Sequence, residues 1–254
     1  MITLAYHLVD QAFYAGITRV TPLAFARQIN YLEANGFVTR LPSEPSPSAG
    51  QLRKVVCITF DDAYECVFTH AFPILAERGF RASVYVVVDY IGKSNAWDVR
   101  LSRPIRHMSW TQILELAEAG WDIGSHSLSH PDLCSVGHSR LLAEVVESKA
   151  RLEERLGRAV RTFSYPFGAF SERVVEVVRQ AGYQAAYGMY IPTRLRAPRL
   201  QPFNRARRGV YLLDTLGVFA SKVKEDSGAL LMIMERLVNF CSRGTVLVKG
   251  PKIA

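Results

Sequence analysis

The sequence predicts an α/β fold in which parallel strands form a sheet or a barrel. Short apolar runs rich in β-branched residues alternate with longer segments of helical periodicity, which is typical of parallel strands joined by helices. The run at residues 54–60 (KVVCITF) is almost wholly apolar, as expected of a strand buried on both faces. A length of 254 residues suits one barrel-sized domain, so we expect residues 1–254 to form a single domain.

The expected elements follow in order along the chain. Thr21-Pro22 marks the start of the first helix, and glycines end several later ones. We expect strands at 2–7, 54–60, 82–89, 121–124, 161–165 and 245–249, and helices at 22–34, 66–78, 111–119, 139–156, 171–181 and near 226–241. The Pro- and Ser-rich stretch 41–50 (LPSEPSPSAG) predicts a surface loop. Catalytic groups of barrels gather at the carboxyl ends of the strands, where three segments are notable.

The first segment is Thr59-Phe60-Asp61-Asp62, at the end of the apolar strand. Two adjacent carboxylates at such a position are costly unless a positive group holds them. A divalent metal ion is the simplest such group, with one aspartate as a ligand and the other left to handle a proton. The alternative is a helix N-cap, because Asp is favoured there.

The second segment, residues 125–130 (SHSLSH), places His126 and His130 four residues apart. In a helical turn this spacing puts both imidazoles on one face, where they can bind one metal ion. Two histidines and one carboxylate form a common catalytic zinc site with a position left for water. Two surface histidines in a Ser-rich loop are the alternative.

The third segment, residues 163–168 (FSYPFG), is an aromatic turn at the end of a strand. Such a turn can wall a pocket and direct backbone N–H groups into it, or it can be a plain tight turn. Trp110 and Tyr165 are candidate substrate-binding aromatics that could line such a pocket, although both could be core residues.

The order and spacing of TFDD, HSLSH and SYPFG resemble the polysaccharide deacetylase family, also called carbohydrate esterase family 4 or the NodB-homology group. The resemblance covers roughly residues 1–190, and the segment WTQILELAEAGWDIGSHSLSHPDL is particularly similar. It implies a distorted (β/α) barrel of seven or eight strands. It also implies a metal-dependent hydrolase that removes N-acetyl groups from an amino-sugar glycan, with one divalent ion, by default Zn²⁺.

The resemblance also implies roles for individual residues. Asp61 would be the general base, and the metal ligands would be Asp62, His126 and His130. The backbone N–H of Phe167 would stabilise the oxyanion. A general acid must then protonate the departing amine.

The sequence departs from the common family pattern in two places. The late strand (TVLVK, 245–249) lacks the usual acid histidine, but the first strand ends in His7, as in a branch of the family whose acid-bearing strand comes first. We therefore expect His7 to be the acid; packing of His7 against Tyr6 at the rim is the alternative. Ser164 stands where many members have an arginine that orients the base, and either Arg161 or an arginine of 199–208 could replace it.

Two other functions stay open on the sequence alone. One is a carbohydrate-binding module that keeps the metal and has lost turnover, which the missing late histidine and Ser164 would favour. The other is a hydrolase of a small non-sugar amide, because the site needs only a C–N bond.

Charge and composition restrict the partners. The chain carries 31 basic and 23 acidic residues, an excess of +8 that can attract anionic partners. Six arginines between 194 and 208 predict an anion-facing rim or a solvated loop: Arg194, Arg196, Arg199, Arg205, Arg207 and Arg208. We expect no nucleic-acid partner, while peripheral contact with an anionic membrane stays open. With no signal peptide and no apolar run of about 18 residues, a soluble cytoplasmic protein is expected.

Overall fold

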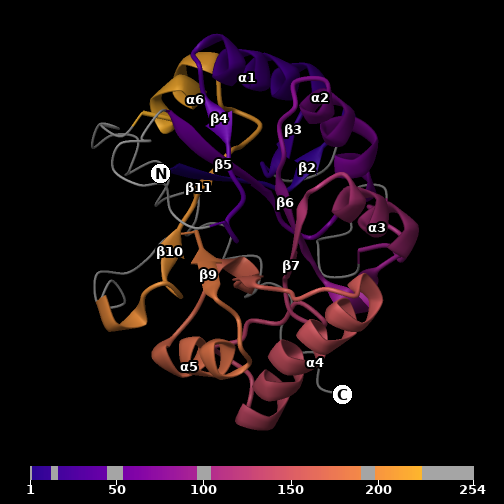
Figure 1. Cartoon of the computed structure of the whole chain (residues 1–254), viewed down its shortest axis with the longest axis vertical. Helices are drawn as coiled ribbons and strands as arrows, with labels where there is room; N and C mark the ends of the chain where they lie inside the picture. Colours follow the sequence, from indigo (N-terminus) through magenta and orange to yellow (C-terminus); the bar gives the residue numbers. More distant parts are fainter. Residues whose placement is uncertain (1, 13–16, 45–53, 96–103, 190–197, 225–254) are drawn as a thin grey trace.

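The β-branched apolar runs form one parallel sheet at the centre of the protein. The computed structural model describes residues 2–12, 17–44, 54–95, 104–189 and 198–224 (Figure 1). The strands of the main sheet are β1 (Ile2–Tyr6), β4 (Val38–Thr39), β5 (Val55–Phe60), β6 (Ser83–Val86), β7 (Asp122–Ser125), β8 (Thr162–Ser164), β9 (Ala185–Gly188), β10 (Arg205–Ala206) and β11 (Arg208–Gly209).

The sheet is almost closed into a barrel. Its order is β10-β9-β8-β7-β6-β5-β1-β11, with β4 added beside β5, and every pairing is parallel. The two strands at its ends, β10 and β11, are separated in the sequence by Arg207 alone. The predicted distorted (β/α) barrel is thus confirmed, and its seam lies at Arg207. A separate two-stranded sheet pairs β2 (Leu8–Val9) with β3 (Arg19–Val20).

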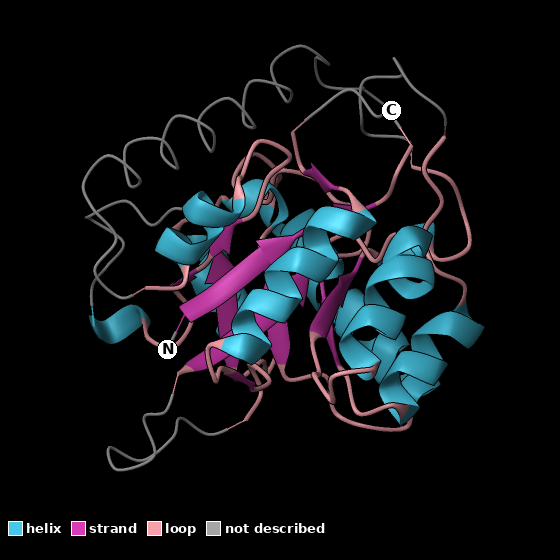
Figure 2. Ribbon diagram, turned by 90° about the horizontal axis from the view of Figure 1, so that it is seen from above, coloured by secondary structure: helices cyan, strands magenta, loops and turns pink. Residues whose placement is uncertain are grey.

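Helices surround the strands (Figure 2). They are α1 (Pro22–Ala34), α2 (Phe72–Ala76), α3 (Trp110–Glu118), α4 (His138–Leu156), α5 (Glu172–Gln180) and α6 (Leu216–Lys222). Side-chain caps fix several starts: Thr21 accepts from Ala24 N–H, and Ser109 forms a capping box with Gln112. Gly157, with φ of 64°, ends α4 in the left-handed conformation that glycine adopts without strain.

The structure refines two predicted elements. The segment expected as one helix at 66–78 starts as a π-helical turn (Val67–Ala71) and continues as α2, where Pro73 has no N–H to donate. The strand expected at 82–89 ends at Val86, because the N–H groups of Val88 and Asp89 donate to carbonyls of the loop after β7. The helix near 226–241 and the strand at 245–249 lie outside the described residues.

The core fills both the barrel and the layer between strands and helices. Strand residues such as Leu4, Ile58 and Val84 are fully buried, as are Ile29 of α1 and Leu152 of α4. None of the helices that the structure describes combines the length and apolarity needed to cross a bilayer.

Candidate metal centre

The carboxyl ends of neighbouring strands bring the predicted site residues to one end of the barrel. His7 follows β1, the pair Asp61-Asp62 follows β5, and His126 follows β7. The N–H of Asp61 donates to the Tyr6 carbonyl and that of His126 to the Val86 carbonyl, so the chain is still held by the neighbouring strand where the polar residues begin. The segments identified in the sequence therefore meet because parallel strands end at the same edge.

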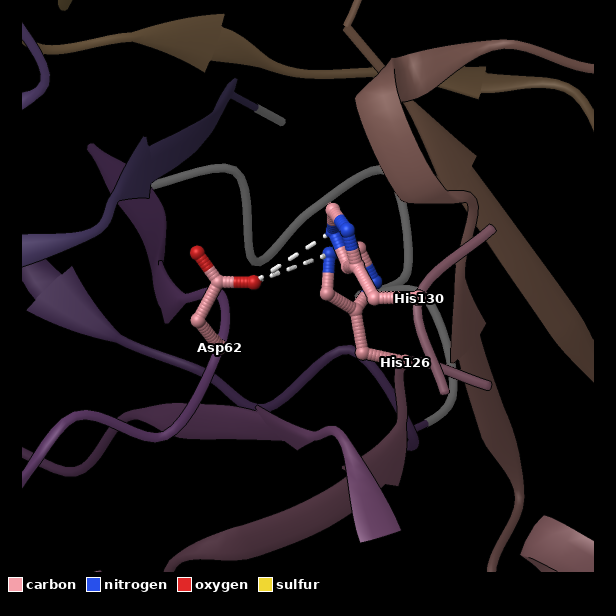
Figure 3. Close-up of side chains that lie close together, drawn as sticks. All are labelled: Asp62, His126 and His130. Carbon is pink, nitrogen blue, oxygen red and sulfur yellow. Dashed lines mark ion pairs between the residues drawn. The ribbon is translucent and has the colours of Figure 1, made fainter. Parts of the chain in front are cut away.

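Three of the predicted site residues, Asp62, His126 and His130, converge in a buried cluster (Figure 3). Oδ1 of Asp62 lies 3.5 Å from Nε2 of His126 and 3.5 Å from Nε2 of His130. One ligand atom from each lies within 4.8 Å of the others, and all three residues are buried. Four ligands at Zn–N and Zn–O distances of roughly 2.0–2.1 Å in a tetrahedron are about 3.3 Å apart, so the spacing suits such an ion.

The protonation of the two imidazoles also suits a metal. Nδ1 of His126 lies 2.7 Å from the Ser164 carbonyl oxygen, which can only accept, so Nδ1 carries the proton and the Nε2 lone pair faces Asp62. Burial lowers the pKa of His126 to about 4 and the pKa of His130 well below its usual value. Both rings are therefore neutral near pH 7, as metal ligands must be.

The loops that carry the cluster have an unusual backbone conformation. Among the described residues, the non-glycine residues with positive φ are Asp62 (69°), Ala63 (52°), Ser127 (70°), His130 (61°) and Phe167 (57°). Four of them belong to the three segments around the cluster, and Ala63 directly follows the first of these segments. Strained conformations of this kind persist where the surrounding structure enforces them, and they concentrate at functional sites.

Asp62 does not cap a helix. Helical residues begin at Glu65, three positions later, so Asp62 is not the residue that directly precedes them. The Asp62 carbonyl instead accepts from Nδ1 of the buried His107, at 2.6 Å. His107 comes from a segment that has no metal-site pattern in the sequence, so sequence reasoning missed it.

Asp61 is held by a buried arginine. The Arg207 guanidinium donates to both carboxylate oxygens, at 2.8 and 2.7 Å, and also to Oγ of Ser164 (2.7 Å) and Oγ1 of Thr59 (3.1 Å). Burial alone would raise the pKa of Asp61, but the charge of Arg207 outweighs it and holds that pKa well below its ordinary value. Asp61 is therefore a carboxylate with a fixed orientation.

Arg207 thus supplies the guanidinium for which the sequence had left two candidates, Arg161 and an arginine of 199–208. Ser164, which replaces the usual arginine, accepts a hydrogen bond from Arg207, which comes from the barrel seam. Arg161, the other candidate, is exposed and precedes β8, at the end of the strand opposite Ser164, so the structure does not bring it to the cluster.

His7 lies beside Asp61 at the edge of the cluster. Its Nε2 is 3.9 Å from Oδ2 of Asp61, and about a fifth of its side chain (21%) is exposed, against 3% for Asp61. His7 is thus a neighbour of Asp61 that solvent can reach.

The aromatic candidates have different environments. The Phe167 ring packs edge-on against His130, with centroids 4.7 Å apart, in a turn that places this residue at the cluster. Tyr165 is fully buried and donates its hydroxyl to the Phe203 carbonyl, which makes it a core residue. Trp110, at the start of α3, lies under the Arg155 guanidinium, 5.7 Å from the ring centroid, in the helical layer.

The described arginines of the 194–208 group have partners within the protein. Arg199 pairs with Glu172 on the surface, and Arg205 donates to the Tyr187 hydroxyl. Arg208 donates to the carbonyls of Lys222 and Lys224. Arg194 and Arg196 lie outside the described residues, and of the others Arg205 and Arg208 make these contacts from the two strands at the barrel seam.

Comparisons with known proteins agree with this architecture. Residues 49–186, more than half of the chain, match the family model described as polysaccharide deacetylase. A Bacillus subtilis protein named as a polysaccharide deacetylase, YxkH, is 27% identical over 185 residues, which cover 71% of this chain and 61% of that protein. The poly-beta-1,6-N-acetyl-D-glucosamine N-deacetylase of Staphylococcus epidermidis is 24% identical over 82% of this chain and 72% of its own length.

Solved structures extend the likeness to most of the chain. IcaB from Ammonifex degensii superposes with a TM-score of 0.73 at 25% identity, covering 87% of this chain and 96% of that chain. BC0361, a polysaccharide deacetylase from Bacillus cereus, gives a TM-score of 0.71 at 25% identity, covering 88% and 68%. The chain spans less than two thirds of YxkH, so that protein is the longer of the two.

Proposed function

Since this chain belongs to the polysaccharide deacetylase family, we propose that it is a metal-dependent hydrolase that removes N-acetyl groups from an amino-sugar glycan. The observation that carries the proposal is the convergence of Asp62, His126 and His130 on one buried point beside an oriented Asp61. The relative from Staphylococcus epidermidis, named as a deacetylase of poly-beta-1,6-N-acetyl-D-glucosamine, supports a glycan as the substrate.

The three side chains Asp62, His126 and His130 would hold one divalent ion, with zinc as the expected metal because two imidazoles and one carboxylate are a common catalytic zinc set. When bound, such an ion supplies a water molecule of lowered pKa and polarises the acetyl carbonyl. The position of His126 does not depend on the ion alone, because the Ser164 carbonyl already fixes the orientation of its ring.

Asp61 would act as the general base. It is ionised near neutral pH, since Arg207 holds its pKa well below the ordinary value. Each of its oxygens accepts one bond from Arg207 and keeps a further lone pair, so the carboxylate can accept the proton of an attacking water without leaving the guanidinium. Arg207 is therefore a positioning residue for the base.

The departing amine would take its proton from His7. This histidine lies 3.9 Å from Asp61, comes from the neighbouring strand and is partly open to solvent, as an acid that must be reprotonated should be. The backbone N–H of Phe167, in the turn beside His130, would stabilise the negative oxygen that forms during attack.

Acetate release tests the proposal. The purified protein should release acetate from acetylated amino-sugar oligomers, lose this activity on chelation and regain it when zinc is added back. A protein that binds these oligomers tightly without releasing acetate would be a binding module instead. Activity on small acetamides alone, with none on the oligomers, would place the substrate outside the glycans.

A further inference from the structure

The loop between the two histidines is held by a carboxylate that belongs to another element. Resting on the proposed function, we propose that Glu144 of α4 is a positioning residue that fixes residues 126–130 so that both imidazoles face Asp62. Glu144 itself is not among the residues that converge on the metal position.

Glu144 makes three hydrogen bonds to the middle of this loop. Its Oε2 accepts from the N–H groups of Leu128 (3.0 Å) and Ser129 (2.8 Å), and its Oε1 accepts from the Ser129 hydroxyl (2.5 Å). Only 4% of the side chain is exposed, and Nε of Arg140 lies 3.7 Å from Oε1. A buried carboxylate with this many donors is a fixed part of the structure.

The loop needs acceptors from outside its own backbone. Ser127 and His130 both have positive φ, which turns the N–H groups between them away from any regular ladder. Side chains accept all four consecutive N–H groups: Ser125 accepts from Ser127, Glu144 from Leu128 and Ser129, and Ser127 from His130.

Among these acceptors, Glu144 alone is charged and comes from a segment that is distant in the sequence, the helix α4. One helical turn further along α4, Ser148 accepts a hydrogen bond from Ser125, so one face of α4 holds both the middle of the loop and the strand end that precedes it. Of the two uncharged serine acceptors, Ser127 lies within the loop and moves with it, and Ser125 is the last residue of β7, directly before the loop. Glu144 therefore provides the fixed reference that sets the distance between His126 and His130.

Metal affinity tests the proposal most directly, because a residue that only stabilised the fold would lower the melting temperature without changing the affinity of the folded protein. Glu144→Ala should weaken zinc binding, measured by competition with a chelator, by roughly 10–100-fold, as is usual for partners of metal ligands. Glu144→Gln keeps an oxygen that can accept from both N–H groups, so it should recover most of the affinity. Glu147→Ala, an exposed position on the same helix, is the matched control.

Hydrogen exchange gives a second result that needs no metal. In the metal-free protein, Glu144→Ala should speed exchange at the amides of Leu128 and Ser129, whereas Glu147→Ala should not. Zinc affinity within about twofold of wild type in a folded Glu144→Ala protein, or unchanged exchange at these amides, would overturn the proposal. If Glu144→Ala does not fold, Ser129→Ala, which removes the hydroxyl bond to Oε1, decides in the same assays: it should weaken zinc binding and speed exchange at these amides, and wild-type values in both would overturn the proposal.

If the proposed function itself were wrong, the zinc-binding measurements would give a different pattern. Wild-type protein would then bind zinc no better than Asp62→Ala does, whereas failure of the Glu144 proposal alone leaves tight, Asp62-dependent binding in every Glu144 variant.

Discussion

The buried pair of Arg207 and Asp61 should be strongly coupled in the free energy of unfolding. Arg207→Met removes the guanidinium but keeps much of its apolar volume, and Asp61→Asn removes the charge of the carboxylate but keeps its shape. Each single change leaves one buried charge without its partner, whereas the double change removes both charges.

The size of the effect follows from the burial of the pair. The two side chains are 0% and 3% exposed, and two parallel N–H to O bonds of 2.8 and 2.7 Å join them. Removing one member of such a buried pair destabilises a protein by about 3–5 kcal/mol, mainly because the other charge loses its compensation. The double variant should lose far less than the sum of the single losses, with a coupling of about 3 kcal/mol.

Urea unfolding of the metal-free protein measures this coupling, because metal binding would add its own stabilisation. Arg207→Lys is a useful comparison, since it keeps the charge but cannot form the two parallel bonds. It should unfold more readily than wild type and less readily than Arg207→Met. Additive losses in the double variant, or an Arg207→Met protein as stable as wild type, would refute the assignment of Arg207 as the group that compensates and orients Asp61.

Three more predictions concern the acid, the barrel interior and pH. His7→Ala should lower turnover by roughly 10²–10⁴-fold with zinc content unchanged, and full turnover would remove His7 as the acid. Gly124→Ala would place a Cβ 2.4 Å from the Tyr85 ring, and it should lower the free energy of unfolding by about 1–3 kcal/mol. The control Gly137→Ala adds a Cβ where the space is open, so it should cost much less. Equal losses in the two variants would contradict this packing. Folding lowers the pKa of His126 from 6.5 to about 4, so as the pH drops the unfolded chain takes up a proton before the folded protein does. The metal-free protein should therefore lose stability between pH 6.5 and 4, by roughly 3 kcal/mol for this histidine. A flat stability profile over that interval would exclude the buried neutral ring.

The parts of the fold that local sequence determines were the ones that could be predicted. The β-branched run at 54–60 became β5, and the periodic segment at 139–156 became α4, with Gly157 as its stop. Short strands such as β10 and β11, of two residues each, have no periodicity to detect, so the strands that close the barrel could not be located in the sequence, although the family resemblance implied a barrel.

The candidate site divides in the same way. Asp61, Asp62, His126 and His130 stand in compact motifs at strand ends, and their meeting at one end of the barrel could be predicted from those positions. Arg207 is 146 positions from Asp61, and in the sequence it is one arginine of a cluster. Only the three-dimensional closure of the barrel separates this guanidinium from its neighbours and directs it to the Asp61 carboxylate.

Glu144 and His107 escaped sequence reasoning for a related reason. Each binds backbone groups in a segment that carries a candidate metal ligand, through Leu128 and Ser129 in one case and Asp62 in the other. Such contacts depend on positive φ values in the loops, which are enforced by tertiary contacts and leave no local pattern in non-glycine residues.

Equilibrium dialysis against buffered zinc, with the bound ion located by crystallography, tests the central claim most directly. We predict one ion per chain, ligated by Oδ1 of Asp62 and by Nε2 of both His126 and His130, and a loss of that ion in the Asp62→Ala protein. An ion bound elsewhere, or a stoichiometry that the Asp62→Ala change leaves intact, would contradict the claim that these three side chains form the metal centre.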